Sequence, residues 1–347
     1  MLKPEVFSYA TYYGALAWLG YYLLWTAALR HGARAAMVAV KRTNRFPDGT
    51  PLIQRYTPIA ALDRQLISAV IFYHGLLDGT DPAHGLLLVD VHSTMQATAL
   101  CIMAQTRASL PFTASLLIPT VWGIVNQFYG AAFVYPLYLL CQTVWHGFEA
   151  FPAVNDSRIN LALVASAVWS SILPLAFLFP LFVPSCVARR QRAIALYRAS
   201  PIVLTLLQWM GEHVPLERVF PTVPESAPYL VVAVTAAAAH LYAILGAAVA
   251  SYSPPVTMKE MLYRIYLPST SRPKLPAAVL SRAAHEFLQY DMLILAAAFI
   301  LCANVLLAPV LPVATWLIIA SLFVAMVALG PGAVLALSFA LRWYLQQ

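Results

Sequence analysis

The chain has 347 residues, of which 61% are hydrophobic and 10% are charged, whereas about a quarter of the residues of a soluble domain are charged. The net charge of +7 would suit a nucleic-acid partner, but the basic residues cluster in polar loops and no nucleic-acid fingerprint or Gly-rich phosphate loop is present. The apolar residues form long runs without the alternation of a membrane β-barrel. The composition therefore predicts an all-α, polytopic integral membrane helical bundle, organised as one domain over residues 1–347.

Apolar segments predict about nine transmembrane helices, within a range of about seven to nine. The first, residues 7–29, is rich in Tyr and Trp, as membrane interfaces are. Residues 113–144 contain internal Gly and Pro and are predicted as one kinked span; residues 311–345 are predicted as one long kinked span or two short ones. No internal repeat is visible. The other predicted spans are residues 63–77, 85–105, 160–187, 201–214, 229–251 and 283–307.

The distribution of Lys and Arg predicts the orientation in the membrane. With this set of spans, most of the 21 basic residues lie on one side, which we assign to the cytosol. The basic loop 30–62 and the polar loop 253–282 are then cytosolic, and the D-G-T-D-P turn at 78–82 is lumenal. The prediction is a protein of the endoplasmic reticulum membrane with a lumenal N-terminus and a cytosolic C-terminus.

The sequence carries no recognisable metal or cofactor motif. It lacks H-x-x-x-H and H-E-x-x-H spacings, histidine boxes and the paired aspartates that hold Mg²⁺ and diphosphate in soluble terpene synthases. We therefore expect no cofactor, and metal-free acid–base chemistry. The four cysteines have no C-x-x-C spacing and are predicted to be free thiols packed among the helices; they are Cys101, Cys141, Cys186 and Cys302.

The stretch from Asp63 to Arg107 places ionisable side chains at membrane depth, where such groups usually face a cavity or a partner. His74 and Asp78 are four residues apart, which would put them on one face of the second span. The alternatives are a packed core histidine and a turn residue. Asp90 lies inside the apolar run G-L-L-L-V-D-V. A carboxyl group buried there without a partner would be neutralised, as a Brønsted acid requires.

A second cluster of polar residues lies in the eighth predicted span. Glu286 follows Arg282 by four residues, so an ion pair on the helix is the alternative to a functional role. Asp291 lies deeper and is the second candidate acid. Other polar groups predicted near the middle of the membrane either bridge the two clusters or hydrogen-bond helices together; they are Asn126, Gln127 and His240.

Three motifs within residues 58–140 resemble a fungal family. An apolar helix ends in an acidic turn (A-L-D-R-Q-L-I-S-A-V-I-F-Y-H-G-L-L-D-G-T-D-P), the next helix ends in M-A-Q-T-R, and a third segment reads W-G-I-V-N-Q-F-Y-G-A-A-F-V-Y-P-L-Y. The chain resembles the membrane-bound terpene cyclases of ascofuranone- and macrophorin-type meroterpenoid pathways, and the related epoxide hydrolases of aurovertin and citreoviridin type. The residues that contribute most are Trp122, Gly123, Gln127, Gly130 and Pro136.

The resemblance implies an enzyme of secondary-metabolite biosynthesis that protonates an epoxide or alkene on an apolar chain, where aromatic faces stabilise the developing carbocation. We expect Asp90 to be the acid, supported by His74 or Asp78. Asp291 is the alternative acid, and Glu286 is a further candidate. The expected partners are a prenylated or polyene epoxide substrate, the lipid bilayer and other enzymes of the pathway. The expected substrate-binding residues are Tyr73, His92, Gln96, Trp122, Asn126, Gln127 and His240.

Three other functions fit part of this pattern. A membrane epoxide hydrolase would use the same acid but admit water to the pocket. A sterol-isomerase-like enzyme also uses buried acids on a lipid, although such chains are shorter and have fewer spans. A transporter or lipid-binding protein would require polar groups continuous across the membrane and, commonly, repeat symmetry.

Overall fold

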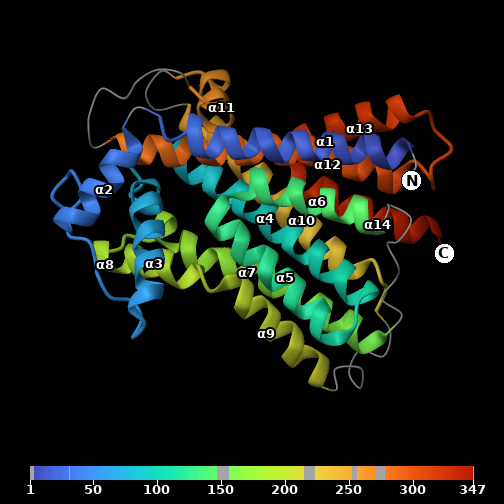
Figure 1. Cartoon of the computed structure of the whole chain (residues 1–347). Coiled ribbons are helices and arrows are strands. Elements are labelled where there is room, and N and C mark those ends of the chain that lie inside the picture. Colours follow the sequence, from blue (N-terminus) through green and yellow to red (C-terminus); the bar gives the residue numbers. More distant parts are fainter. Residues whose placement is uncertain are drawn as a thin grey trace.

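The computed structural model of this chain describes residues 4–30, 32–146, 156–214, 223–251, 256–269 and 278–346. In this part of the chain every extended regular element is a helix, which confirms the all-α prediction (Figure 1). The helices are α1 (Pro4–Tyr22), η1 (Leu23–Ala27), α2 (Ala33–Thr43), α3 (Ala60–Tyr73), η2 (His74–Leu76), α4 (Pro82–Ser109), α5 (Phe112–Tyr129), α6 (Ala131–His146), α7 (Ser157–Phe182), α8 (Val187–Tyr197), α9 (Ser200–His213), α10 (Ala227–Ala250), α11 (Met258–Tyr266), α12 (Ala278–Leu307), α13 (Thr315–Leu329) and α14 (Pro331–Gln346).

Two long helices, α4 and α12, form the centre of the bundle. They have 28 and 30 residues and are buried along most of their length. Helix α4 begins where Pro82 takes the first helical position and the Asp81 carboxylate accepts the Ala83 N–H at 3.0 Å. Apolar side chains of both helices join the same core cluster, in which Leu100 and Phe299 are almost fully buried. These two helices are the frame on which the candidate site is built.

Within the described residues, four helices are long and apolar enough to cross a membrane: α4, α7, α10 and α12. A fifth crossing is possible if α8 and α9, which meet at a bend of 56°, act as one broken span. The structure therefore agrees with a helical membrane protein, but the predicted nine spans are not confirmed. All four cysteines are free, as the sequence predicted.

Two helix pairs, α5–α6 and α13–α14, are each broken at one buried glycine. Gly130 (φ 88°, ψ 155°) and Gly330 (φ 85°, ψ 156°) adopt nearly the same backbone conformation, which residues with a Cβ rarely take. Each glycine N–H still donates to the helix before it, to Asn126 O at 2.9 Å and to Met326 O at 3.0 Å. In Figure 1, α6 and α14 each turn back toward the end from which α5 and α13 came. Each pair is therefore a helical hairpin with a buried apex.

These hairpins change the predicted topology. Residues 113–144 do not form one kinked span but two helices that turn back, and residues 311–345 form two short helices, which was the second alternative. The start of α1 and the end of α14 consequently lie at the same end of the bundle in Figure 1. This arrangement does not support the predicted placement of the two termini on opposite sides of the membrane, which stays a prediction.

Four shorter helices, α2, α3, α8 and α11, gather at the other end of the bundle, in the left half of Figure 1. The Gln191 amide of α8 donates to the Pro51 carbonyl at 2.8 Å, which joins α8 to the loop before α3. Arg264 of α11 forms an ion pair with Asp81 at 2.7 Å. The acidic turn at 78–82 therefore lies beside the polar loop that contains α11.

This ion pair contradicts a second part of the predicted topology. A membrane cannot separate the turn at 78–82 from the loop 253–282, because Arg264 of the loop reaches Asp81 of the turn. Helix α3, the predicted second span, is shorter than a bilayer crossing. It has 14 residues and packs against α2, α8 and α12 among the loops of this end, whereas crossing the bilayer takes about 20 residues.

Candidate active site

A cavity of about 510 Å³ opens between α3, α4, α5, α9 and α12. Most of its wall is apolar or aromatic, with a few polar side chains, as is usual for a small-molecule site. Four apolar lining residues are also exposed on the outer surface and therefore mark the mouth; they are Trp25, Leu62, Phe128 and Ile202. The wall and mouth together suit an apolar ligand.

Asp291 supplies the carboxyl group of this cavity; none of the other described lining residues is acidic. Its Oδ1 accepts the Ala132 N–H at 2.6 Å, in the first turn of α6. That N–H has no partner within its own helix because the chain breaks at Gly130. The hairpin apex thus orients the carboxyl group, while Oδ2 takes no part in this hydrogen bond.

Aromatic rings line the cavity around Phe287, which lies one helical turn before Asp291 on α12. Phe72 of α3 and Phe287 of α12 meet edge to face, with ring centroids 5.1 Å apart, and Trp25 packs on the other edge of Phe287 at 6.2 Å. All three line the cavity, as does Tyr135. Their faces can stabilise a cation that develops close to the carboxyl group.

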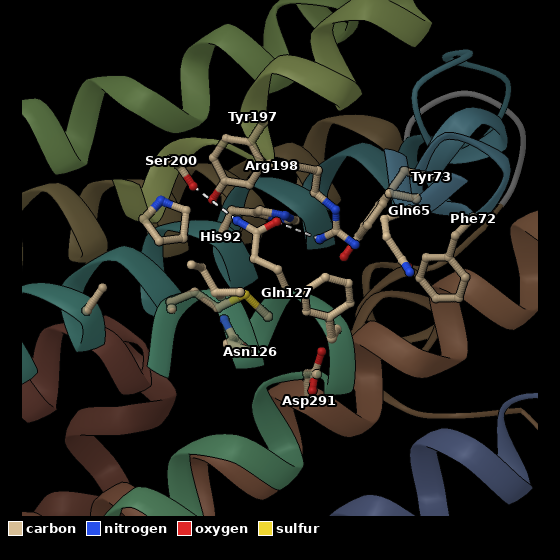
Figure 2. Close-up of a pocket in the computed structure, with 18 of the residues that line it drawn as sticks. Gln65, Phe72, Tyr73, His92, Asn126, Gln127, Tyr197, Arg198, Ser200 and Asp291 are labelled. Atoms are coloured by element: carbon tan, nitrogen blue, oxygen red, sulfur yellow. Dashed lines mark hydrogen bonds between the residues drawn. The ribbon is translucent and has the colours of Figure 1, made fainter. Parts of the chain in front are cut away.

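A polar group of residues forms the opposite wall in the view of Figure 2. The Arg198 guanidinium donates to Gln127 Oε1 at 2.8 Å and lies over the Tyr73 ring, 5.7 Å from its centroid. Gln127 in turn donates to Ser200 Oγ at 3.2 Å. The amide of Asn126 lines the wall between these residues and Asp291. The cavity therefore has a basic polar side and an acidic side.

The structure brings half of the residues singled out in the sequence to this cavity. Asp291 lines it, together with five of the predicted substrate-binding residues, which are Tyr73, His92, Gln96, Asn126 and Gln127. The others do not line it; they are Asp90, His74, Asp78, Glu286, Trp122 and His240. Trp122 instead packs edge to face on Tyr138, with centroids 5.5 Å apart.

Asp90 is fully buried but has partners of its own. Its Oδ2 lies 2.7 Å from Nδ1 of His240 and accepts the Tyr266 hydroxyl, also at 2.7 Å. The other ring nitrogen of His240 lies 3.2 Å from the Val327 carbonyl, so both nitrogens face acceptors. This geometry fits an imidazolium–carboxylate pair that joins α4, α10 and α13. The sequence expectation that Asp90 lacks a partner is therefore wrong.

Comparison with known proteins places this arrangement in a family. Residues 11–343 match the CtvD domain. The chain belongs to the CtvD domain family. It is 47% identical to the terpene cyclase alnG of Emericella nidulans over 353 aligned residues, which cover 98% of this chain and 95% of the relative. The terpene cyclase DEP1 of Alternaria brassicicola is 27% identical over 84% of each chain, and the terpene cyclase ctvD of Aspergillus terreus is 24% identical over 56% of this chain and 57% of its own. No solved structure matches.

The resemblance to fungal terpene cyclases is thereby confirmed. The motifs that suggested it lie in α3 to α6 of this CtvD-family chain, and Gly130 and Gln127, two of its main residues, lie at the hairpin apex and in the cavity wall. Part of the motif therefore builds the cavity itself.

His74 lies outside the cavity and packs as a core residue. Helix α3 ends at Tyr73, so His74 and Asp78 do not share a helix face, and that prediction is wrong. The His74 ring stacks on Phe46 with centroids 4.2 Å apart. Burial, with Arg190 nearby, lowers the pKa of His74 to about 4, so the imidazole is neutral at neutral pH.

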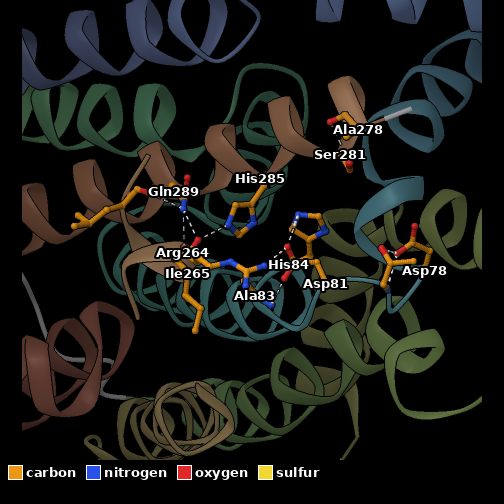
Figure 3. A network of polar contacts seen from close by, with 12 residues as sticks. Asp78, Asp81, Ala83, His84, Arg264, Ile265, Ala278, Ser281, His285 and Gln289 are labelled. Atoms are coloured by element: carbon orange, nitrogen blue, oxygen red, sulfur yellow. Dashed lines mark hydrogen bonds and ion pairs between the residues drawn. The ribbon is translucent and has the colours of Figure 1, made fainter. Parts of the chain in front are cut away.

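The acidic turn before α4 is a structural element. Asp78 is exposed and accepts the N–H and the hydroxyl of Thr80, at 2.9 and 2.7 Å. Asp81 pairs with Arg264 (Figure 3). Burial alone would raise the pKa of Asp81, but His84, the capping N–H and Arg264 together hold that pKa below its usual value. The turn alternative for Asp78 is the one observed.

Glu286 faces a second, polar cavity rather than the first. Arg282 donates to its carboxylate at 2.9 Å, which is the ion pair given as the alternative. In Figure 3, His285 and Gln289 converge on the Arg264 carbonyl, each at 2.8 Å. These contacts hold α11 against α12.

Several polar residues of the cavity wall were not predicted, among them Gln65, Tyr197 and Arg198. Arg198 was assigned to a cytosolic basic patch because three other arginines precede it closely. The available signal was its position two residues before Ser200-Pro201, a helix start that predicts a break in the chain. For metals, the described residues contain no group of three His, Cys, Asp or Glu side chains that could hold an ion.

Proposed function

We propose that this protein is an integral membrane terpene cyclase that acts on a prenylated or epoxidised apolar intermediate of secondary metabolism. The observation that carries the proposal is the single carboxyl group of Asp291 in a large, mainly aromatic and apolar cavity. The relatives of similar length in the CtvD domain family are named terpene cyclases, which supports the reaction class.

The proposed chemistry uses Asp291 as a Brønsted acid. In the protonated form, Oδ1 accepts the Ala132 N–H and Oδ2 carries the proton. Transfer of that proton to an epoxide oxygen, or to an alkene, opens the C–O bond or the π bond and leaves a carbocation. A second double bond of the chain attacks this centre and forms the ring. Loss of a proton to the Asp291 carboxylate ends the reaction and restores the acid.

The wall next to the acid supports this course. Phe72 and Trp25 pack on Phe287, one turn before Asp291 on α12, and these rings line the cavity in which the positive charge would develop. The first-ranked acid of the sequence, Asp90, is assigned a positioning role instead, because it is paired with His240 and Tyr266 away from the cavity wall.

The membrane provides the route of entry in this proposal. The exposed apolar residues at the mouth and the four or five helices of spanning length support it. We place the protein in the endoplasmic reticulum membrane, near other enzymes of its pathway. The proposed reaction requires no cofactor.

An epoxide hydrolase is the second candidate. The observation that favours it is the row of amides in the cavity wall, since Gln65, Gln96, Asn126 and Gln127 can hold a water molecule. The same acid would open the epoxide, and that water would attack the carbon in place of an alkene.

The deciding experiment is product identification. Membranes that contain the protein are incubated separately with an epoxidised farnesyl-phenol and an epoxidised polyene, with membranes lacking the protein as the control. Cyclised products of unchanged mass support the cyclase, and diols that gain one water support the hydrolase. Consumption of neither substrate would count against both.

A further inference from the structure

Arg198 brings a positive charge into the cavity without an ion-pair partner. Among the residues that the structure describes, no carboxylate lies within ion-pair distance of its guanidinium, and no other Lys or Arg lines the cavity. An uncompensated charge in a largely apolar wall is unfavourable. A position of this kind is typical of a group whose partner is the ligand.

The fold holds the guanidinium in a fixed place. Arg198 lies at the 56° bend between α8 and α9, so the chain turns its side chain toward the cavity. Gln127 Oε1 accepts one of its five N–H groups at 2.8 Å, and the Tyr73 ring lies beneath it. The guanidinium has further N–H groups that can donate to an oxygen anion.

Two neighbours add to the same side of the cavity. Helix α9 begins at Ser200, and its N-terminus carries a partial positive charge. The Tyr197 hydroxyl, which accepts a hydrogen bond from Gln96 at 2.7 Å and has Ser200 as a further hydrogen-bond partner, lines the same side. Asp291 lies on the other side in Figure 2, so a head bound at Arg198 leaves a chain free to reach the acid.

We propose that Arg198 binds the anionic head of the substrate, a carboxylate or an acidic enol, and so fixes which part of its apolar chain meets Asp291. This inference rests on the proposed function and adds a substrate class to it. The single arginine favours a head with one negative charge. A diphosphate would bring at least two, which one guanidinium does not match.

The test uses ligands that need not react. Full-length protein in nanodiscs is titrated by calorimetry with farnesoic acid and with its methyl ester at a pH where the acid is ionised. The acid and the ester partition differently into lipid, and this difference cancels when the ratio of their two affinities is compared between variants in the same lipid. Because charge-assisted hydrogen bonds are the stronger class, we expect the wild type to prefer the acid by about tenfold or more.

Variants separate the charge from the fold. Arg198→Met and Arg198→Gln should bind the ester as the wild type does and lose the preference for the acid, whereas Arg198→Lys should keep part of it. The matched control is Arg192→Met, an exposed arginine of α8 outside the cavity, which should keep the wild-type ratio. The proposal is overturned if the wild type shows no preference, or if a neutral variant that still binds the ester retains it.

Measurements of ligand binding and of turnover distinguish failure of the Arg198 head site from failure of the proposed enzyme. Asp291→Asn should retain the preference for the acid although it lacks the proton donor. A protein that prefers the acid but converts no epoxide would count against the proposed enzyme and leave the Arg198 head site standing. Turnover that persists without any preference for the acid would overturn the head site alone.

Discussion

Asp90 on α4 and Asp291 on α12 lie on the two central helices, and each is placed beside the hairpin apex of the other half of the chain. Asp291 contacts the first turn of α6, just after Gly130. Asp90 reaches the second apex through His240, whose side chain would lie 2.9 Å from a Cβ on Gly330. The two carboxyl groups thus have similar burial and similar positions relative to a broken helix pair.

The difference lies in what fills the space around each carboxyl group. At Asp90, the His240 ring and the Tyr266 hydroxyl both lie 2.7 Å from Oδ2. At Asp291, a backbone N–H holds Oδ1 and a cavity lies alongside. The same residue type therefore serves as an ion-pair partner in one half of the bundle and as a candidate acid in the other. Burial alone does not distinguish these roles; the neighbouring helices do.

Removal of the proton at Asp291 should have the largest effect. Asp291→Asn keeps the shape of the side chain but cannot donate a proton as an acid, so we expect turnover to fall by about a hundredfold or more. Product formation from the epoxide that the wild type converts, normalised to folded protein, measures it. Asp90→Asn is the matched control and should keep most of its turnover per folded molecule. The reverse order of activities would return the acid role to Asp90.

The Asp90 site should instead control stability. His240→Leu leaves the buried Asp90 carboxylate without its ionic partner, and we expect the free energy of unfolding to fall by about 3–5 kcal/mol. Thermal or denaturant unfolding in detergent measures this loss. The double variant Asp90→Asn/His240→Leu should recover part of it, because no charge remains unpaired. Equal stability of the single and double variants would contradict the ion pair.

The two apex glycines offer a third comparison. Gly130→Ala places a Cβ 2.5 Å from Leu24 and 2.7 Å from Phe287 in a left-handed conformation, and Gly330→Ala places one 2.9 Å from His240. Both should lower stability by about 1–3 kcal/mol. Gly130→Ala should also reduce turnover of the folded fraction, because it displaces the N–H that holds Asp291. If Gly330→Ala reduces turnover equally, the two apexes are not functionally distinct.

The smallest effect is expected on the same helix as Asp291. Glu286 lies five residues earlier but pairs with Arg282 beside the polar cavity, where the Arg282 side chain is 25% exposed and the Glu286 side chain 11%. Glu286→Gln should leave turnover unchanged and alter stability by about 1 kcal/mol or less. Assays of turnover and unfolding together check this. A large loss of turnover would extend the active site to the second cavity.

Sequence reasoning found the polar residues that lie within apolar runs, and missed those that lie in basic loops. Asp291, Asn126 and Gln127 were named because a polar group at membrane depth calls for an explanation, and all three line the cavity. Arg198 was missed because it follows a run of arginines, now seen in α8, that the sequence assigned to a basic loop. Only the bend between α8 and α9 separates it from them.

The topology was less predictable than the composition. The topology inferred from Lys and Arg depends on the number of membrane crossings. That inference fails when an apolar segment turns back within the bundle. The turns at Gly130 and Gly330 divide two apolar segments of ordinary hydropathy into helix pairs that turn back. Helix α3 was also predicted as a span because it is apolar, but its buried apolar residues pack against protein, mainly α8 and α12.

The sequence by itself determined the all-helical class and the resemblance to fungal terpene cyclases, because these follow from composition and motifs. Only the tertiary structure decided which aspartate faces the cavity. Periodicity specifies which residues share a face of one helix, but it does not specify which other helix covers that face. His240 and Tyr266 lie 150 and 176 positions beyond Asp90 in the chain, and their packing against it leaves Asp291 as the acid of the cavity.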